Sequence, residues 1–495
     1  MTTSRESLLA TSFSLIDWAF VAGFLVLSLV IGIWARRRVA SLDDFLVAGR
    51  RLRSVWGVAT LTSTEMGLVT IVYFSQEAYA NGFVAIVTGV IAAATMWLIG
   101  QTGFVIKPLR ARELRTVPEY FENRFSPGVR WIAGVLTFLT GVLNMGIFLQ
   151  VEGRFLAIVM GLPAETLPII MAVLLAFVVV YTMLGGMVSV VLTDVFQFVV
   201  ITIGIILTSY FAFSHAGGTE GMISAVREQF GSSGFNLWEA PKYGLLFMIW
   251  TFLYYMSGWS SWQPVVQRTL SMQNVSTAMQ LFRISSLFMF FRACLPMLWG
   301  IAALAVVGVV ADSQTALPEM LVHVLPAGLV GFIVVGFLAA SMSTYDSYLL
   351  SFSAILVQDV CAPLAGGKIS EQQRMLYTRG DIGDCSLRLF LGRVLYIHGN
   401  DFPTDCPYWI AFLRRYHKRI SGGIVLEGRQ YTGCLRCLCF GCNPARNLAR
   451  CPRNQRDKCR PAQLCACPCG LGCWVADLSV KVGHDSVRKA FTILP

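Results

Sequence analysis

Long apolar stretches separated by short polar loops fill about the first 360 residues of the chain. A helix needs about 20 consecutive apolar residues to cross a hydrocarbon core about 30 Å thick. Nine stretches reach that length, and the pattern fixes their ends only to within several residues. The nine predicted spans are 16–35, 54–79, 82–106, 131–150, 165–184, 188–213, 244–266, 284–310 and 328–358.

The first predicted span differs from a signal peptide. It is longer than a signal-peptide core, and Arg36-Arg37-Arg38 follows it without a small-residue cleavage site. We therefore expect it to remain on the chain as a membrane helix.

Two of the spans contain residues that interrupt helices. The second carries a polar run from Thr60 to Gly67 that includes Glu65, and the seventh carries Ser, Gly and Pro between Ser257 and Pro264. Irregular backbone at membrane depth is tolerated only where it lines a cavity or packs within protein. Interruptions at corresponding places in two halves are typical of a transporter's central binding site. The alternatives are that Glu65 marks a span end at the interface, and that the serine-rich run is a packing patch.

A small, hydroxyl-bearing face occurs in the ninth span. Ala340, Ser343 and Thr344 are spaced by three and four residues, which places them on one side of a helix. Their oxygens suit a hard cation such as sodium, by analogy with other hard ions. Helix–helix packing through small residues is the alternative explanation.

Composition and charge agree with a membrane protein. A mean hydropathy of +0.63 with 14% charged residues is not the balance of a soluble protein. Basic residues concentrate in alternate loops, and the positive-inside rule then places the N-terminus outside. The net charge of +11 thus reflects topology and gives no reason to expect nucleic-acid binding. We expect a multi-pass protein in the lipid bilayer of the cell (inner) membrane. The predicted inner loops 36–53, 107–130 and 267–283 carry Arg36, Arg37, Arg38, Arg50, Arg51, Arg53, Lys107, Arg110, Arg112, Arg115, Arg124, Arg130, Arg268 and Arg283, whereas the outer loops hold Arg154, Arg227 and Lys242.

Several distinctive motifs occur between about residues 15 and 378. The most specific stretch runs from Tyr181 to Gln197 and reads YTMLGGMVSVVLTDVFQ. A second, from Leu338 to Ser347, reads LAASMSTYDS, and three shorter ones are DDFLVAGR at 43–50, TVPEYFENRF at 116–125 and VQR at 266–268. Together these motifs resemble the sodium:solute symporter family, and the second resembles that family's sodium motif.

The resemblance implies an all-α polytopic membrane protein with a broken-helix, five-plus-five inverted-repeat fold. Repeat one would comprise spans two to six, and repeat two would begin at span seven and stop incomplete after its third helix. The implied sodium site uses backbone carbonyls of Ser63, Met66 and Ala340 with the hydroxyls of Ser343 and Thr344. The implied sodium path adds Glu65, where some relatives carry an aspartate and others an asparagine, and Asp194 near the inner exit. A carboxylate inside the membrane is costly without a counter-ion, which agrees with these roles.

The implied activity is sodium-coupled symport of a small solute by alternating access. Sodium is the coupling ion, and we expect no cofactor and no enzymatic chemistry. The broken helices supply Thr70, Tyr255, Trp259 and Gln263 as candidates for the solute cavity, but the sequence does not identify the solute. Two alternatives are an inactive truncated fragment and a membrane sensor derived from a transporter.

The chain changes character near residue 380. Cysteine occurs twice up to residue 364 and twelve times after it. The pairs Cys434/Cys437 and Cys439/Cys442 crowd together without the spacing of a zinc module, so we expect no zinc site. Back-translation of residues 382–395 permits an apolar membrane segment in the next frame. Our hypothesis divides the chain into an N-terminal tail (1–15), a transmembrane symporter domain (16–379) and a poorly ordered, out-of-frame tail (380–495). The nucleotide sequence of the gene would test the frameshift.

Overall fold

The computed structural model describes residues 13–326, 328–364, 370–378 and 380, and within them the fold is helical without a named strand. The predicted all-α class is confirmed. The long helices, and the shorter helices that form the two broken spans, are α2 (Leu15–Ala35), α4 (Ser54–Glu65), α5 (Leu68–Asn81), α6 (Ile86–Thr102), α9 (Pro127–Met160), α10 (Leu167–His215), α12 (Leu245–Ser261), α13 (Gln263–Ser271), α14 (Val275–Val307) and α16 (Val330–Ile355). The remaining α-helices are α3 (Leu42–Val47), α7 (Ile106–Ala111), α8 (Val117–Arg124), α11 (Gly218–Phe230), α15 (Ala316–Val324) and α17 (Ala362–Leu364).

Each predicted span coincides with helix in the described part of the chain. The fifth and sixth spans form the single helix α10, which bends sharply at Gly186 (φ 50°, ψ −142°). A side chain there would be strained by the positive φ, and a Cβ would lie 2.5 Å from the carbonyl oxygen of Phe45. Several helices are longer than predicted, so Arg154 and Arg283 lie on α9 and α14 instead of in loops.

By length and composition, six helical stretches in the described residues could cross a membrane. One runs through α5 and α6 without a gap, and another takes in all but the first residue of α10. The pair α12–α13 falls outside this set because each of its helices is too short alone. The expectation of an integral, multi-pass membrane protein is therefore confirmed.

Both predicted helix interruptions are present. The first separates α4 from α5 at Met66 and Gly67, where Gly67 is extended (ψ 148°). A Cβ on Gly67 would lie 2.5 Å from the Thr344 hydroxyl, so the absence of a side chain lets this break approach α16 closely. The second interruption lies at Trp262 (ψ 115°), and Pro264 then occupies the first turn of α13, where proline fits.

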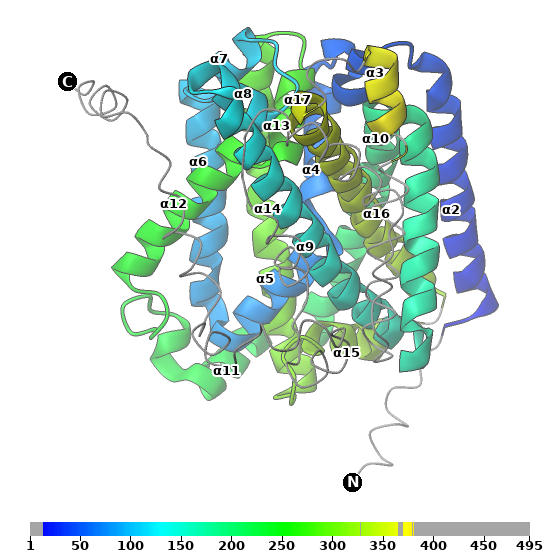
Figure 1. Ribbon diagram of the computed structural model, residues 1–495. Coiled ribbons are helices and arrows are strands. Elements are labelled where there is room, and N and C mark those ends of the chain that lie inside the picture. The colour runs from blue at the N-terminus through cyan, green and yellow to red at the C-terminus, as the bar shows by residue number, and fades with distance from the viewer. Residues whose placement is uncertain (1–12, 327, 365–369, 379, 381–495) are drawn as a thin grey trace, which may run out of the picture. The chain divides into compact units, whose positions relative to one another are not determined.

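Helix α16 lies at the centre of the packing. Nearly all of its side chains are buried, and it contacts α10, α9, α2 and α4. Figure 1 shows the short helices α3, α7 and α8 near one end of the bundle, together with α13, and α11 and α15 near the other. The first end is the arginine-rich one, because the predicted inner loops connect there. The cysteine-rich segment, and with it the zinc and frameshift hypotheses, lies outside the described residues.

Candidate functional site

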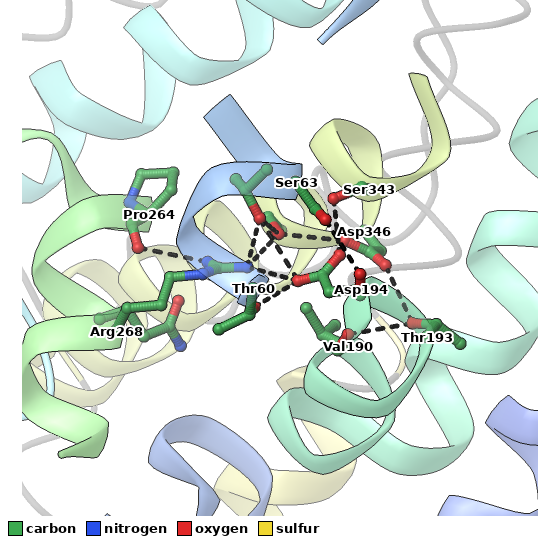
Figure 2. Close-up of polar contacts among 12 residues, drawn as sticks. Thr60, Ser63, Val190, Thr193, Asp194, Pro264, Arg268, Ser343 and Asp346 are labelled. Atoms are coloured by element: carbon green, nitrogen blue, oxygen red, sulfur yellow. Dashed lines mark hydrogen bonds and ion pairs between the residues drawn. The ribbon is translucent and has the colours of Figure 1, made fainter. Parts of the chain in front are cut away.

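A buried polar cluster occupies the break of α4–α5, and Asp194 of α10 lies at its centre (Figure 2). The Ser343 hydroxyl donates to Asp194 Oδ1 at 2.6 Å, and the Ser63 hydroxyl donates to the Asp194 backbone carbonyl at 2.9 Å. Thr60 donates to Asp194 Oδ2. The structure thus brings together three residues that the sequence analysis selected from separate motifs.

Arg268 is the positive charge of this cluster. It belongs to α13 and is fully buried, with one guanidinium nitrogen 3.3 Å from Asp194 Oδ2. The same nitrogen donates to Thr64 at 2.7 Å and to Ser347. The sequence analysis placed Arg268 in an inner loop, which is wrong because α13 continues to Ser271. Asp194 could have indicated a buried arginine from the sequence, because a carboxylate within a membrane span requires a nearby cation.

A second carboxylate adjoins the cluster. Asp346 of α16 accepts from the Tyr181 hydroxyl at 2.9 Å and from the Ser347 hydroxyl at 3.0 Å. When Asp194 and Asp346 are both ionised, two negative charges face the single guanidinium of Arg268. The cluster then carries one excess negative charge in a buried environment, which favours a bound cation.

Thr344 is the predicted sodium ligand that links α16 to the last turn of α4. The Thr344 hydroxyl donates to the carbonyl of Thr64 at 2.8 Å and lies 3.1 Å from the carbonyl of Ala340. The Ser63 carbonyl faces the amide of Met66 at 3.2 Å, at the last turn of α4. Thr344 therefore lies beside a backbone carbonyl in the last turn of α4, next in sequence to the predicted ligand Ser63.

Glu65 lies apart from Asp194. Its carboxylate is 3.5 Å from the guanidinium of Arg292 on α14, and the Arg292 Nε donates to the Glu65 backbone carbonyl. The two predicted sodium-path residues thus form ion pairs with different arginines. The second oxygen of Glu65, Oε1, is buried without a hydrogen-bond partner among the described residues.

Three of the four candidate solute residues lie around Arg292. It donates to the Thr70 hydroxyl at 3.3 Å, and its guanidinium lies 6.0 Å from the centre of the Trp259 ring. Tyr255 stacks on Trp259, with 5.8 Å between ring centres. The sequence analysis missed Arg292, although an arginine in the middle of a predicted span is itself a functional signal.

Gln263 does not join this group. Its side-chain carbonyl accepts from the Val117 amide at 2.9 Å, and its amide group lies 3.4 Å from the Arg115 carbonyl. Gln263 thus joins α13 by hydrogen bonds to the start of α8 and the residues just before it, at the arginine-rich end of the bundle.

Comparisons with known proteins agree on one family. The model of the sodium:solute symporter family matches residues 45–382. The chain is 26% identical over 385 residues to a sodium/glucose cotransporter of Vibrio parahaemolyticus, covering 70% of this chain and 69% of the relative. It is 24% identical over 385 residues to a sodium/sialic acid symporter of Aliivibrio fischeri, covering 74% and 73%.

A solved structure shares the fold. The chain superposes on the substrate-bound outward-open state of a Na⁺-coupled sialic acid symporter with a TM-score of 0.71 and 20% identity. The match covers 78% of this chain and 83% of that structure. The predicted broken-helix symporter fold is confirmed by this likeness.

Proposed function

The chain belongs to the sodium:solute symporter family, and we propose that it binds its coupling sodium between the α4–α5 break and α16. Membership makes the protein a sodium-coupled secondary transporter of a small solute, and its relatives are transporters and not enzymes. The observation that carries the sodium proposal is the hydrogen bond from the Thr344 hydroxyl to the Thr64 carbonyl, in the last turn of α4 before the break.

The proposed ligands are three carbonyl and two hydroxyl oxygens. The carbonyls belong to Ser63, Met66 and Ala340, and the hydroxyls to Ser343 and Thr344. Hard cations take such oxygen ligands. A carbonyl oxygen that already accepts one hydrogen bond, as that of Ser63 does from the Met66 amide, keeps a second lone pair for an ion. A hydroxyl that donates its hydrogen to a carbonyl or carboxylate keeps lone pairs for an ion.

Sodium would add a further link between α16 and the break. The ligands lie partly on α16 and partly on the break, so binding of the ion stabilises one arrangement of the two. Asp194 orients Ser343 and places a negative charge beside the ion. The positive charge of Arg268 partly neutralises that of Asp194. A ligand shifts a conformational equilibrium only through such differential contacts.

We further propose that the solute binds beside Arg292 and offers it an anionic group. Among the described residues, one terminal nitrogen of Arg292 contacts only the sulfur of Met289, at 3.9 Å, so its donors remain available. A guanidinium binds a carboxylate through paired hydrogen bonds, and the Trp259 and Tyr255 rings would flank the solute. Two of the relatives are named as carriers of an acid.

Sodium-dependent thermal stabilisation of the purified full-length chain tests the sodium site, because binding raises the unfolding temperature without requiring turnover. We expect Ser343→Ala and Thr344→Ala to weaken the apparent sodium affinity at least about ten-fold, as loss of direct ligands does. Ser353→Ala is the matched control, since Ser353 is buried on α16 away from the break. Equal sodium affinities in the three variants would show that the face of Ala340, Ser343 and Thr344 serves helix packing and does not bind sodium.

The solute proposal is tested at fixed sodium with a panel of small carboxylates and neutral sugars. Carboxylates should raise the unfolding temperature of the wild type and lose that effect in Arg292→Gln. Arg154→Gln provides a control, because Arg154 pairs with Asp312 at a half-exposed position. Stabilisation by sugars alone, unchanged in Arg292→Gln, would contradict the assignment.

A further inference from the structure

A second buried acidic group lies between α9 and α16 and takes no part in the sodium or solute proposals. Glu152 of α9 is 1% exposed, and its Oε1 accepts from the Val69 amide at 3.1 Å. Val69 is the second residue of α5, immediately beyond the break. The carboxyl group of Glu152 therefore touches the beginning of the helix that follows the proposed sodium site.

Three polar atoms around Glu152 lie close to one another without forming a hydrogen bond of good geometry within the described part of the chain. They are Oε2 of Glu152, the hydroxyl of Ser341 and the hydroxyl of Tyr345, all buried. The two hydroxyls face the carboxyl group from α16. Buried polar atoms are nearly always paired, so three unpaired ones in one place call for an explanation.

No positive charge within the described residues pairs with Glu152. The charged groups on neighbouring elements are occupied elsewhere, and the other titratable groups that face it are Tyr345 and Tyr348. The occupied pairs are Arg154–Asp312 at one end of α9, Arg130–Asp359 and Arg130–Glu122 at the other, Glu77–Lys242 from α5, Glu319–Thr315 on α15, and Asp346–Tyr181 on the far side of α16.

The local chemistry favours a proton over a metal ion. A carboxylate buried without a cation is costly, and protonation removes that cost. The acid O–H can then donate to Tyr345 or Ser341. Three side-chain oxygens are few for a hard cation, which takes six or more ligands in the best-described sites. The ionised form is also accessible, because the Val69 amide and the N-terminus of α5 stabilise a negative charge.

We propose that Glu152, Ser341 and Tyr345 form a proton-binding site that responds to the state of the α4–α5 break. In one state Glu152 carries the proton, and its acid O–H donates a hydrogen bond to a hydroxyl of α16. In the other state the proton has passed to water, and the carboxylate holds the amide end of α5. The link to sodium rests on the proposed sodium site, whereas the proton site itself does not.

The link has a definite direction. A negative charge on Glu152, beside the first turn of α5, attracts a cation bound at the break, so sodium should bind more tightly when the proton is absent. Binding energies are linked reciprocally, so addition of sodium should also release the proton. Lower pH should therefore weaken sodium binding.

Infrared spectroscopy of the purified full-length protein tests the proton site directly. The C=O band of a protonated carboxylic acid should be present in the wild type at pH 6 and absent at the same position in Glu152→Gln. The band should shrink on titration to pH 9. Glu77→Gln is the control, since Glu77 already pairs with Lys242 at 2.5 Å. A spectrum of Glu152→Gln identical to that of the wild type at every pH would overturn the proposal.

A second measurement tests the link between the proton on Glu152 and the sodium site. The apparent sodium affinity is measured from thermal shifts at pH 6 and at pH 8. We expect the wild type to bind sodium at least about five-fold more weakly at pH 6, the lower end of ordinary coupling between sites. Glu152→Gln should give one affinity at both pH values. A pH dependence retained in Glu152→Gln would overturn the link. Absence of any sodium response in the wild type would contradict the sodium site instead, and the infrared result would still decide the proton site.

Discussion

The two faces of α16 carry the same kinds of residue, yet the hydroxyl groups on the two faces differ in their hydrogen-bond partners. Toward α4 and α10, the hydroxyls of Ser343, Thr344 and Ser347 all have hydrogen-bond partners. Toward α9, the hydroxyls of Ser341 and Tyr345 have none among the described residues. Both faces are buried and both meet a carboxylate. The difference is that Arg268 reaches the first face, whereas no described cation reaches the second.

This comparison separates two uses of a buried acid. Asp194 meets a guanidinium and a hydroxyl donor, which favour its anionic form, and the proposed sodium site uses that charge. Glu152 has one amide donor and unpaired neighbours, so its protonation state is free to change. A cation from a distant helix therefore decides whether an acid in the membrane remains charged.

The largest difference in stability between variants of the two faces of α16 is expected for Arg268→Gln. Removing one partner of a buried pair leaves an uncompensated charge and costs about 3–5 kcal/mol. We expect a marked fall in the unfolding temperature of the purified protein, with partial recovery in the double variant Arg268→Gln/Asp194→Asn. Arg154→Gln removes a half-exposed pair and should cost about 1 kcal/mol or less. Similar losses for the two arginine variants would contradict the picture of a charged, buried first face.

An intermediate effect is expected for Asp194→Asn on sodium affinity. Asp194 accepts from Ser343 and so positions a proposed ligand, and loss of such a partner costs about 10–100-fold in metal affinity. Sodium titrations followed by thermal shift measure this change. The same titrations on Asp194→Glu, which keeps the charge, should show partial rescue. An asparagine variant with wild-type sodium affinity would remove Asp194 from the site.

The smallest effect should appear on the second face, in a matched pair of tyrosines. The Tyr181 hydroxyl donates to Asp346, so Tyr181→Phe should destabilise the protein by about 1–3 kcal/mol. The Tyr345 hydroxyl has only its contact with the Glu152 carboxyl group among the described residues, so Tyr345→Phe should destabilise the protein less than Tyr181→Phe does. Denaturation of the two variants under one set of conditions provides the comparison. A larger loss in Tyr345→Phe would mean that its hydroxyl is already firmly bonded.

Local sequence determined the helices and the positions of their interruptions. Apolar runs of membrane length predicted the spans, and Gly67 and Pro264 marked the two breaks because glycine and proline have distinctive backbone requirements. The spacing of Ala340, Ser343 and Thr344 gave one helix face, since helical periodicity is a local property. Symporter motifs then selected Asp194 as well.

Only the tertiary structure decided which charges meet. Arg268 pairs with Asp194 across 74 residues of sequence, and Arg292 meets the Glu65 backbone across 227. Periodicity reports which side of a helix is buried, but not which side chain lies opposite. Glu152 illustrates the point most clearly, because its environment depends on an amide of α5 and two hydroxyls of α16. The energy of a buried charge is set by neighbours in space, which no local pattern specifies.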